Sequence, residues 1–237
     1  MIRFQELSKS FGQLMVLDKV SADIPEGKIV AVLGPNGSGK TTLIKSLMGM
    51  VKPDAGQMFI GDRQINRQSD YRKAIDYLPQ ISRHPQNLTA RELVDMLEDI
   101  REQKGDSKMF IDLFGLESHL DKHLHNLSGG TMQKVSIMLS LMFKNEIMIL
   151  DEPTNGLDPV AIIRLKEYLN QERNRGKTII FTTHIIPLVE EIADEIIFLL
   201  EGHIYFQGSV STLLTKESET NLEHAIANVL IKSANHE

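Results

Sequence analysis

A glycine-rich loop at residues 34–42 places the strongest constraint on what this chain can fold into. Its sequence, Gly-Pro-Asn-Gly-Ser-Gly-Lys-Thr-Thr, fits the pattern G-x-x-x-x-G-K-S/T in full. The preceding residues 28–33 form an apolar β-branched run that is typical of a buried strand. After the loop, apolar residues recur at helical spacing, at Leu43, Ile44, Leu47 and Met48. The pattern therefore predicts a loop that joins a strand to a helix.

The residue types of this loop suit the binding of a nucleoside triphosphate. Glycines let the backbone turn successive N–H groups toward phosphate oxygens, and the helix start adds a partial positive charge of roughly +0.5. Lys40 is predicted to reach the β- and γ-phosphates, and the Thr41 hydroxyl to ligate Mg²⁺. The alternative is a glycine-rich turn that binds nothing. The predicted nucleotide-binding residues are Gly34, Asn36, Gly37, Ser38, Gly39, Lys40, Thr41 and Thr42.

Two acidic residues follow a second apolar run. Residues 147–150 lead directly into Asp151 and Glu152. A strand buried on both faces tolerates such residues only at its carboxyl end, where α/β folds bind ligands. Asp151 is predicted to hold Mg²⁺, and Glu152 to polarise an attacking water. The alternative is that two acids simply begin a loop.

Four further positions are candidates for the same site. His184 ends an apolar strand at 177–183, and a histidine at that edge can contact a γ-phosphate; a lone histidine is otherwise inert. Gln80 follows a strand end and either reaches a metal or water, or is a solvated loop residue. Phe11 either stacks on a purine or belongs to the core. Ser128-Gly129-Gly130 precedes a helix and either binds an anion or only caps that helix.

Periodicity indicates an α/β chain, and the length of residues 1–237 suits one large domain or a core with a subdomain. Strands are predicted within 1–33, 57–60 and 72–78. Residues 89–145 are predicted to be mostly helical, opening with a capping box at Thr89. A helix near 188–193, strands near 195–207 and a modest helix after Gly208 complete the prediction. The apolar positions of the helix that follows Thr89 are Leu93, Met96, Leu97 and Ile100.

Composition argues against several classes of function. The formal net charge of −6 disfavours a sequence-independent nucleic-acid binder, and the lack of cysteine excludes disulfides and thiolate metal sites. The longest apolar stretches, such as 196–200, fall far short of the roughly 20 residues that cross a bilayer, and no signal peptide is expected. The 11 methionines and 8 histidines invite a copper-binding hypothesis. Core packing explains the methionines on apolar faces better, namely Met132, Met138, Met142 and Met148.

Taken together, these motifs resemble the ATP-binding subunit of an ABC (ATP-binding cassette) transporter over nearly the whole chain. Residues 34–42 are similar to the Walker A loop of that family and residues 147–152 to its Walker B strand. Residues 127–130 resemble the signature motif, and residues 156–158 the D-loop. Gln80 and His184 match the Q-loop glutamine and the switch histidine, and Phe11 falls where the family has an adenine-stacking aromatic. Thr131 departs from the family, which usually has glutamine there.

The resemblance implies a fold and a reaction. The implied fold is α/β, with a P-loop NTPase core, a mostly parallel sheet, an N-terminal antiparallel β-subdomain and an inserted α-helical subdomain. The helical subdomain would span about 86–143, and a short helical tail about 209–237. The implied reaction is hydrolysis of ATP with Mg²⁺. The implied catalytic residues are Lys40, Gln80, Glu152 and His184, and the implied metal site is Thr41, Gln80 and Asp151.

Partners also follow from the resemblance. Two copies of the chain would pair head to tail, so that Ser128, Gly129 and Gly130 of one copy close on ATP held by the other. This motion would drive an integral membrane permease subunit through a groove near Gln80. The chain would then lie peripherally at the cytoplasmic face of the cell membrane, and no nucleic-acid partner is expected.

The single short cassette and its Gly-Gly-Thr signature resemble the exporter-type ABC-2 group. Within that group, residues 77–89 and 99–101 resemble the ATPase of the transporter used to mature the copper sites of nitrous-oxide reductase, which implies copper or sulfur species. The alternatives are an ABC-2 exporter ATPase for another substrate and a ribosome- or DNA-associated ABC ATPase. The latter is disfavoured by the single cassette, the acidic charge and the lack of a heptad run. A stand-alone P-loop kinase would leave the Ser-Gly-Gly element and Glu152 unexplained.

Overall fold

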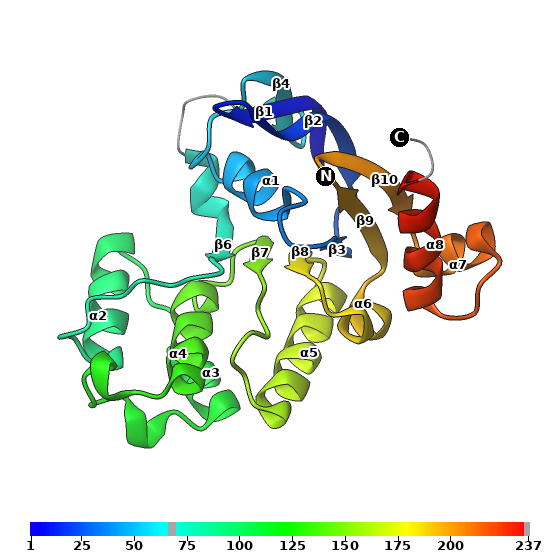
Figure 1. Ribbon diagram of the computed structural model, residues 1–237. Coiled ribbons are helices and arrows are strands. Elements are labelled where there is room, and N and C mark those ends of the chain that lie inside the picture. The colour runs from blue at the N-terminus through cyan, green and yellow to red at the C-terminus, as the bar shows by residue number, and fades with distance from the viewer. Residues whose placement is uncertain (66–69, 235–237) are drawn as a thin grey trace.

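Two β-sheets with a helix packed between them form the half of the molecule that carries the N-terminus (Figure 1). The computed structural model describes residues 1–65 and 70–234, so residues 235–237 of the predicted tail lie outside the described residues. The four-stranded antiparallel sheet has the order β2-β1-β4-β5, and the six-stranded sheet has the order β10-β9-β3-β8-β7-β6. The strands of the first sheet are β1 (Ile2–Phe11), β2 (Leu14–Ile24), β4 (Ala55–Ile60) and β5 (Arg63–Gln64).

The six-stranded sheet is mostly parallel. Strand β3 pairs in parallel with β8 and β9, and β7 pairs in parallel with β8 and β6, whereas the β10–β9 pair is antiparallel. This is the predicted α/β class, with an antiparallel sheet at the N-terminus and helices inserted between β6 and β7. The strands are β3 (Ile29–Leu33), β6 (Ile75–Leu78), β7 (Ile147–Asp151), β8 (Thr178–Thr183), β9 (Glu195–Leu200) and β10 (His203–Gly208).

Both faces of the six-stranded sheet are covered at β3, β7 and β9, which explains why these strands are apolar without alternation. In β3, Val30 and Val32 pack in one core with β1 and α1, while Ile29, Ala31 and Leu33 pack in the other core with the remaining helices. The α-helices are α1 (Lys40–Leu47), α2 (Ala90–Arg101), α3 (Ser107–Phe114), α4 (Gly129–Leu141), α5 (Pro159–Asn174), α6 (Ile186–Ile192), α7 (Val210–Glu217) and α8 (Leu222–Ala234). The 3₁₀ helices are η1 (Asp70–Ala74), η2 (Glu117–His119) and η3 (Leu124–Asn126).

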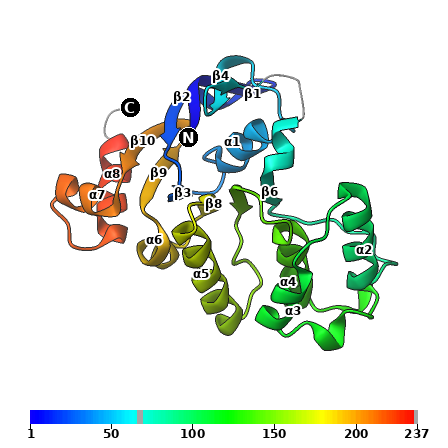
Figure 2. The ribbon, with the colours of Figure 1, turned by 180° about the vertical axis from the view of Figure 1, so that it is seen from behind.

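Helices α2, α3 and α4 form a group to one side of the sheets, and Figure 2 shows the same group from behind. The predicted capping box of α2 is confirmed, because Thr89 accepts from the Glu92 N–H and the Glu92 carboxylate accepts from the Thr89 N–H. The predicted apolar face is wrong at Met96 and Ile100, which are exposed. Leu93 lies in the core and Leu97 packs against it, so only this part of the stripe is covered.

Two further predictions of local structure need correction. The strand expected from residue 72 begins only at Ile75, because Asp70–Ala74 forms a 3₁₀ helix whose charged side chains face solvent. The tail holds two helices, α7 and α8, rather than one, and Ser209 caps the first by accepting from the Thr212 N–H. Of the four methionines assigned to the core, Met138, Met142 and Met148 are fully buried, whereas Met132 is partly buried. Among the described residues, no helix has the length and apolarity needed to cross a membrane.

Candidate active site

The glycine loop between β3 and α1 has the sharp geometry that its sequence predicts. Gly34 cannot carry a side chain, because a Cβ atom there would lie 2.0 Å from the Leu199 carbonyl oxygen. Gly39 has a φ of +107° and approaches the Val16 carbonyl on β2, which a Cβ atom would meet at 2.7 Å. The Gly202 N–H, in the β9–β10 turn, donates to the Ser38 carbonyl at 3.2 Å. The loop is therefore held by both sheets.

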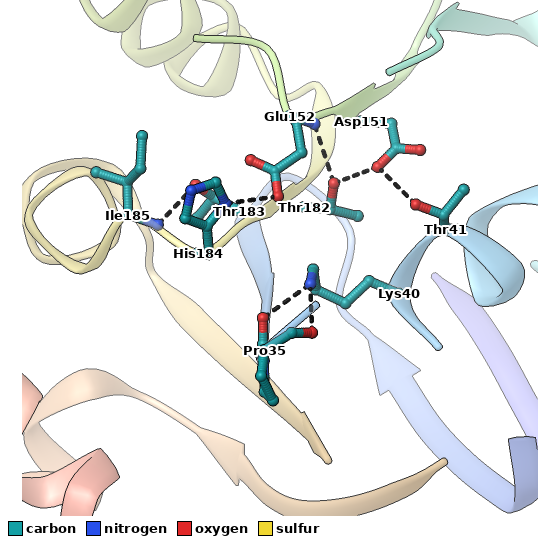
Figure 3. A network of polar contacts seen from close by, with 10 residues as sticks. Pro35, Lys40, Thr41, Asp151, Glu152, Thr182, Thr183, His184 and Ile185 are labelled. Carbon is teal, nitrogen blue, oxygen red and sulfur yellow. Dashed lines mark hydrogen bonds and ion pairs between the residues drawn. The ribbon is translucent and has the colours of Figure 1, made fainter. Parts of the chain in front are cut away.

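Lys40 lies at the centre of this loop and is almost fully buried. Its Nζ donates to the carbonyls of Gly34 at 2.7 Å and Pro35 at 2.9 Å (Figure 3). Burial lowers the pKa of Lys40 below its usual value, and the negative charges of Glu152 and Asp151 oppose that shift. A bound polyanion would act in the same direction as these carboxylates and favour the charged ammonium.

Parallel register brings the carboxyl ends of four strands to one edge of the sheet. The glycine loop follows β3, the acidic pair ends β7, His184 follows β8, and Gln80 lies two residues beyond β6. Ligands of open α/β sheets bind at this edge. The residue pairs that define the edge are Leu33 with Thr183, Asp151 with Thr182, and Leu78 with Leu150.

Asp151 and Glu152 are buried here with unused acceptors. The Thr41 hydroxyl donates to Asp151 Oδ1 at 3.3 Å. Within the described residues, Asp151 Oδ2, Glu152 Oε2 and the Ser38 hydroxyl are buried without a hydrogen-bond partner. Buried polar atoms are rarely left in this state unless a ligand, ion or water satisfies them. Carboxylate and hydroxyl oxygens are the ligands that Mg²⁺ prefers, so Asp151 and Thr41 fit that cation.

His184 contacts the second acid. Its Nδ1 lies 3.0 Å from Glu152 Oε1, and its side chain is half exposed. An ionised carboxylate only accepts hydrogen bonds, so Nδ1 carries the proton in this contact. Gln80 is exposed at the same edge. The structure therefore gathers Lys40, Thr41, both acids and His184 around one point (Figure 3). Gln80 follows a neighbouring strand end, and among the described residues no hydrogen bond joins it to this group.

Phe11 lies at the end of β1, where its side chain is 51% exposed. The interpretation of Phe11 as a core residue is therefore wrong. The Lys9 ammonium lies 5.2 Å from the ring centroid. Because β2 touches Gly39 through Val16, the β1–β2 hairpin adjoins the glycine loop.

The Ser128-Gly129-Gly130 element lies elsewhere. Helix α4 packs on the face of the six-stranded sheet opposite α1. Ser128 is exposed and caps α4 by accepting from the Thr131 N–H at 3.3 Å, and its Oγ lies 2.9 Å from the Thr131 hydroxyl. Among the described residues, no hydrogen bond joins it to the glycine loop. A single copy of the chain therefore does not bring these two anion-binding candidates together.

One contact at the site was missed by sequence reasoning. Thr182, fully buried in β8, donates to Asp151 Oδ1 and accepts from the Glu152 N–H. The sequence does not single Thr182 out, because it is one of three threonines in β8, with Thr178 and Thr183.

Comparison with known proteins decides the family. The ABC transporter family model matches residues 17–155. The lantibiotic transport ATP-binding protein SrtF of Streptococcus pyogenes is 34% identical over 235 residues, covering 98% of each chain. The chain belongs to the ABC transporter family.

Among the other relatives of this ABC ATPase subunit, some are named for import and others for export. The L-cystine import ATP-binding protein TcyC of Bacillus subtilis is 30% identical and covers 97% of this chain and 99% of its own length. The Nod factor export ATP-binding protein I of Rhizobium sp. (strain N33) is 33% identical and covers 88% of this chain and 70% of its own length. The chain is thus the ATP-hydrolysing subunit of a transporter.

Solved structures agree with the fold. A structure described as the ATP binding subunit of an ABC transporter superposes with a TM-score of 0.89 at 26% identity, covering 97% of this chain and 99% of that chain. A structure described as an ATP-binding cassette in a dimeric, post-hydrolysis state bound to ADP and Pi superposes with a TM-score of 0.78 at 25% identity, covering 88% of this chain and 98% of that chain.

Proposed function

We propose that this chain hydrolyses Mg²⁺-bound ATP between two head-to-tail copies of itself and so drives a separate membrane permease. The observation that carries the proposal is the set of unsatisfied groups at one sheet edge. A buried ammonium, Lys40, shares that edge with two buried carboxylates that each keep a free oxygen. Such an arrangement suits a triphosphate with its divalent cation.

In this proposal each residue at the edge has one task. Lys40 exchanges its carbonyl contacts for phosphate oxygens, and the N–H groups of residues 34–42 add further donors. Thr41, Asp151 and Gln80 hold Mg²⁺, which when bound neutralises charge on the phosphates. Glu152 orients the attacking water and accepts its proton, and His184 holds Glu152 and contacts the γ-phosphate. Phe11 stacks on the adenine.

Dimerisation completes the site. Ser128 and Gly129 are exposed and Gly130 is partly buried, and among the described residues this helix start has no anion partner. A second copy related by a two-fold axis places each signature element against the other copy's glycine loop. The dimeric cassette among the solved relatives supports this assembly.

The proposed permease contact is a groove lined by residues that come before and after Gln80 in the sequence, but not by Gln80 itself. The groove has a volume of about 360 Å³, and residues of α2, of β6 and of the segment after Gln80 line it, among them Tyr77, His84, Met96 and Arg101. Its apolar and cationic lining suits an amphipathic segment of a partner. We place the chain peripherally at the cytoplasmic face of the membrane because its relatives are ATP-binding proteins of transporters.

Export is the direction that the resemblance to the exporter-type group implies, and the Nod factor relative is named for export. Copper or sulfur species remain a prediction from residues 77–89 and 99–101 alone, and no comparison supports them. Measuring which candidate stimulates ATP turnover by the purified permease complex tests the substrate directly.

The substitution Glu152→Gln tests the proposed chemistry. It keeps the shape of the side chain but removes the proton acceptor, so hydrolysis should fall about 10²- to 10⁴-fold while ATP binding persists. Dimers should then accumulate with ATP in size-exclusion chromatography.

The matched control is Glu146→Gln, an exposed residue just before β7 at the other end of the same strand. This variant should turn over ATP normally. Wild-type turnover by Glu152→Gln would remove Glu152 from the mechanism.

A further inference from the structure

Thr182 makes two hydrogen bonds that join the proposed metal ligand to the proposed general base. Its Oγ1 donates to Asp151 Oδ1 and accepts from the Glu152 N–H at 3.0 Å (Figure 3). The Glu152 N–H also lies 3.2 Å from the Thr182 carbonyl oxygen. The side chain is fully buried, so no solvent competes for these bonds.

These bonds determine which carboxylate oxygen stays available. Asp151 Oδ1 accepts from both Thr182 and Thr41, whereas Oδ2 is buried with no hydrogen-bond partner within the described residues. A carboxylate held through one oxygen cannot rotate freely about its last torsion. The second oxygen is therefore fixed in place for a ligand.

The same side chain steadies Glu152. Glu152 has a φ of +53°, a left-handed conformation that is uncommon for residues with a side chain. Its N–H is held by Thr182, and its carboxylate contacts His184, which lies two residues further along the chain. Both ends of Glu152 are thus fixed by residues 182–184, at the end of β8 and just after it.

We propose that Thr182 is a positioning residue that aims the free oxygen of Asp151 at Mg²⁺ and fixes the backbone of Glu152 for attack by water. The inference rests on the proposed function of those two acids. The competing explanation is that Asp151 merely satisfies a buried hydroxyl. That explanation predicts an effect on stability without any effect on metal dependence.

The test is Thr182→Val, which removes the hydroxyl and keeps the branched shape. ATP binding measured by calorimetry in EDTA should stay within about twofold of wild type, since the phosphate donors are untouched. The gain in affinity on adding Mg²⁺, and kcat, should each fall about 10- to 100-fold, as is typical for residues that orient metal ligands. Thr182→Ser should restore both. If Thr182→Val does not fold, Thr182→Ala removes the same hydroxyl.

Thr178→Val is the matched control. Thr178 is buried at the opposite end of β8, where its hydroxyl accepts from the Gly27 N–H. Its loss should change the melting temperature but leave the Mg²⁺ dependence intact. The inference would be overturned if Thr178→Val and Thr182→Val lost equal amounts of kcat and of the Mg²⁺-dependent gain in ATP affinity. It would also be overturned if Thr182→Val kept the Mg²⁺ dependence of the wild type. If wild-type protein bound no ATP, the proposed function itself would fail, and the two failures are therefore distinguishable.

Discussion

The chain contains two glycine-rich turns that each open a helix, and they differ in what surrounds them. In the loop before α1, Gly34 and Gly39 are enclosed by backbone from β9 and β2, which leaves no room for a Cβ atom. In the turn before α4, Gly129 has nothing within 4 Å of a Cβ position and Ser128 is exposed. The first turn is therefore enclosed by other parts of its own chain. The second turn exposes its hydrogen-bond donors to solvent, as expected of a surface that a partner covers.

The largest predicted effect separates the two turns by function. Lys40→Ala should abolish ATP binding to the monomer, because it removes the central cation of the first turn. Ser128→Ala should leave monomer binding intact but lower hydrolysis about 10²- to 10³-fold, because in the proposed dimer it removes a donor that the partner copy supplies. Calorimetry on the monomer and turnover at high protein concentration measure the two effects.

Because the chain contains no cysteine, thiols introduced on the two turns can test by cross-linking whether the turns meet in a dimer. Asn36→Cys and Gly129→Cys place single thiols on the two exposed turns. A bifunctional thiol reagent should link the two variants into dimers when ATP is present. A pair made from Asn36→Cys and Glu223→Cys, on the remote helix α8, should stay unlinked. ATP-independent linkage would contradict pairing of the two turns across the dimer.

A matched pair of alanines sharpens the contrast within the second turn. A Cβ atom on Gly130 would lie 2.8 Å from the Gly156 carbonyl oxygen, so Gly130→Ala should cost about 1–3 kcal/mol of unfolding free energy. Gly129→Ala meets no atom, and its helix propensity should raise stability by up to ~1 kcal/mol. Urea denaturation of both variants checks this. Similar free energies of unfolding for the two variants would mean that the segment 153–158 moves to make room for the Gly130→Ala side chain at little cost.

The smallest predicted effect concerns the contact between helix α4, which follows the second turn, and the segment after β6. His84 lies after β6, where its Nε2 is 3.0 Å from the Ser136 hydroxyl on α4. Burial lowers the pKa of His84 below its ordinary value of 6.5. The unfolded chain therefore binds the proton first, and stability should decline as the pH falls below 6.5 toward the lowered pKa.

Melting temperatures measured between pH 7.5 and about 5 check this prediction, because that range covers the titration of an ordinary histidine. His84→Gln should flatten the decline. The same slope in the variant would assign the acid sensitivity to other groups.

Local chemistry made most of the site predictable. Three features could be recognised by their residue types at the end of an apolar run, namely the glycine loop, the acidic pair and His184. Parallel strand pairing then brings those strand ends together. Thr182 could not be found in this way, because its partners lie 30 and 31 positions away and depend on strand register. The exposure of Ile100 also escaped prediction, because an apolar stripe does not say how much of it a neighbour covers.

The hydrogen bond from Gly202 to the Ser38 carbonyl gives the β9–β10 turn an unexpected importance. A Cβ atom on Gly202 would also press on the Val16 carbonyl at 2.8 Å, the same oxygen that limits Gly39. The β9–β10 turn, more than 160 residues after Ser38 in the sequence, thus supports the glycine loop at residues 34–42. Natural variants that weaken nucleotide affinity should therefore turn up at this tip, in a stretch with no recognisable motif.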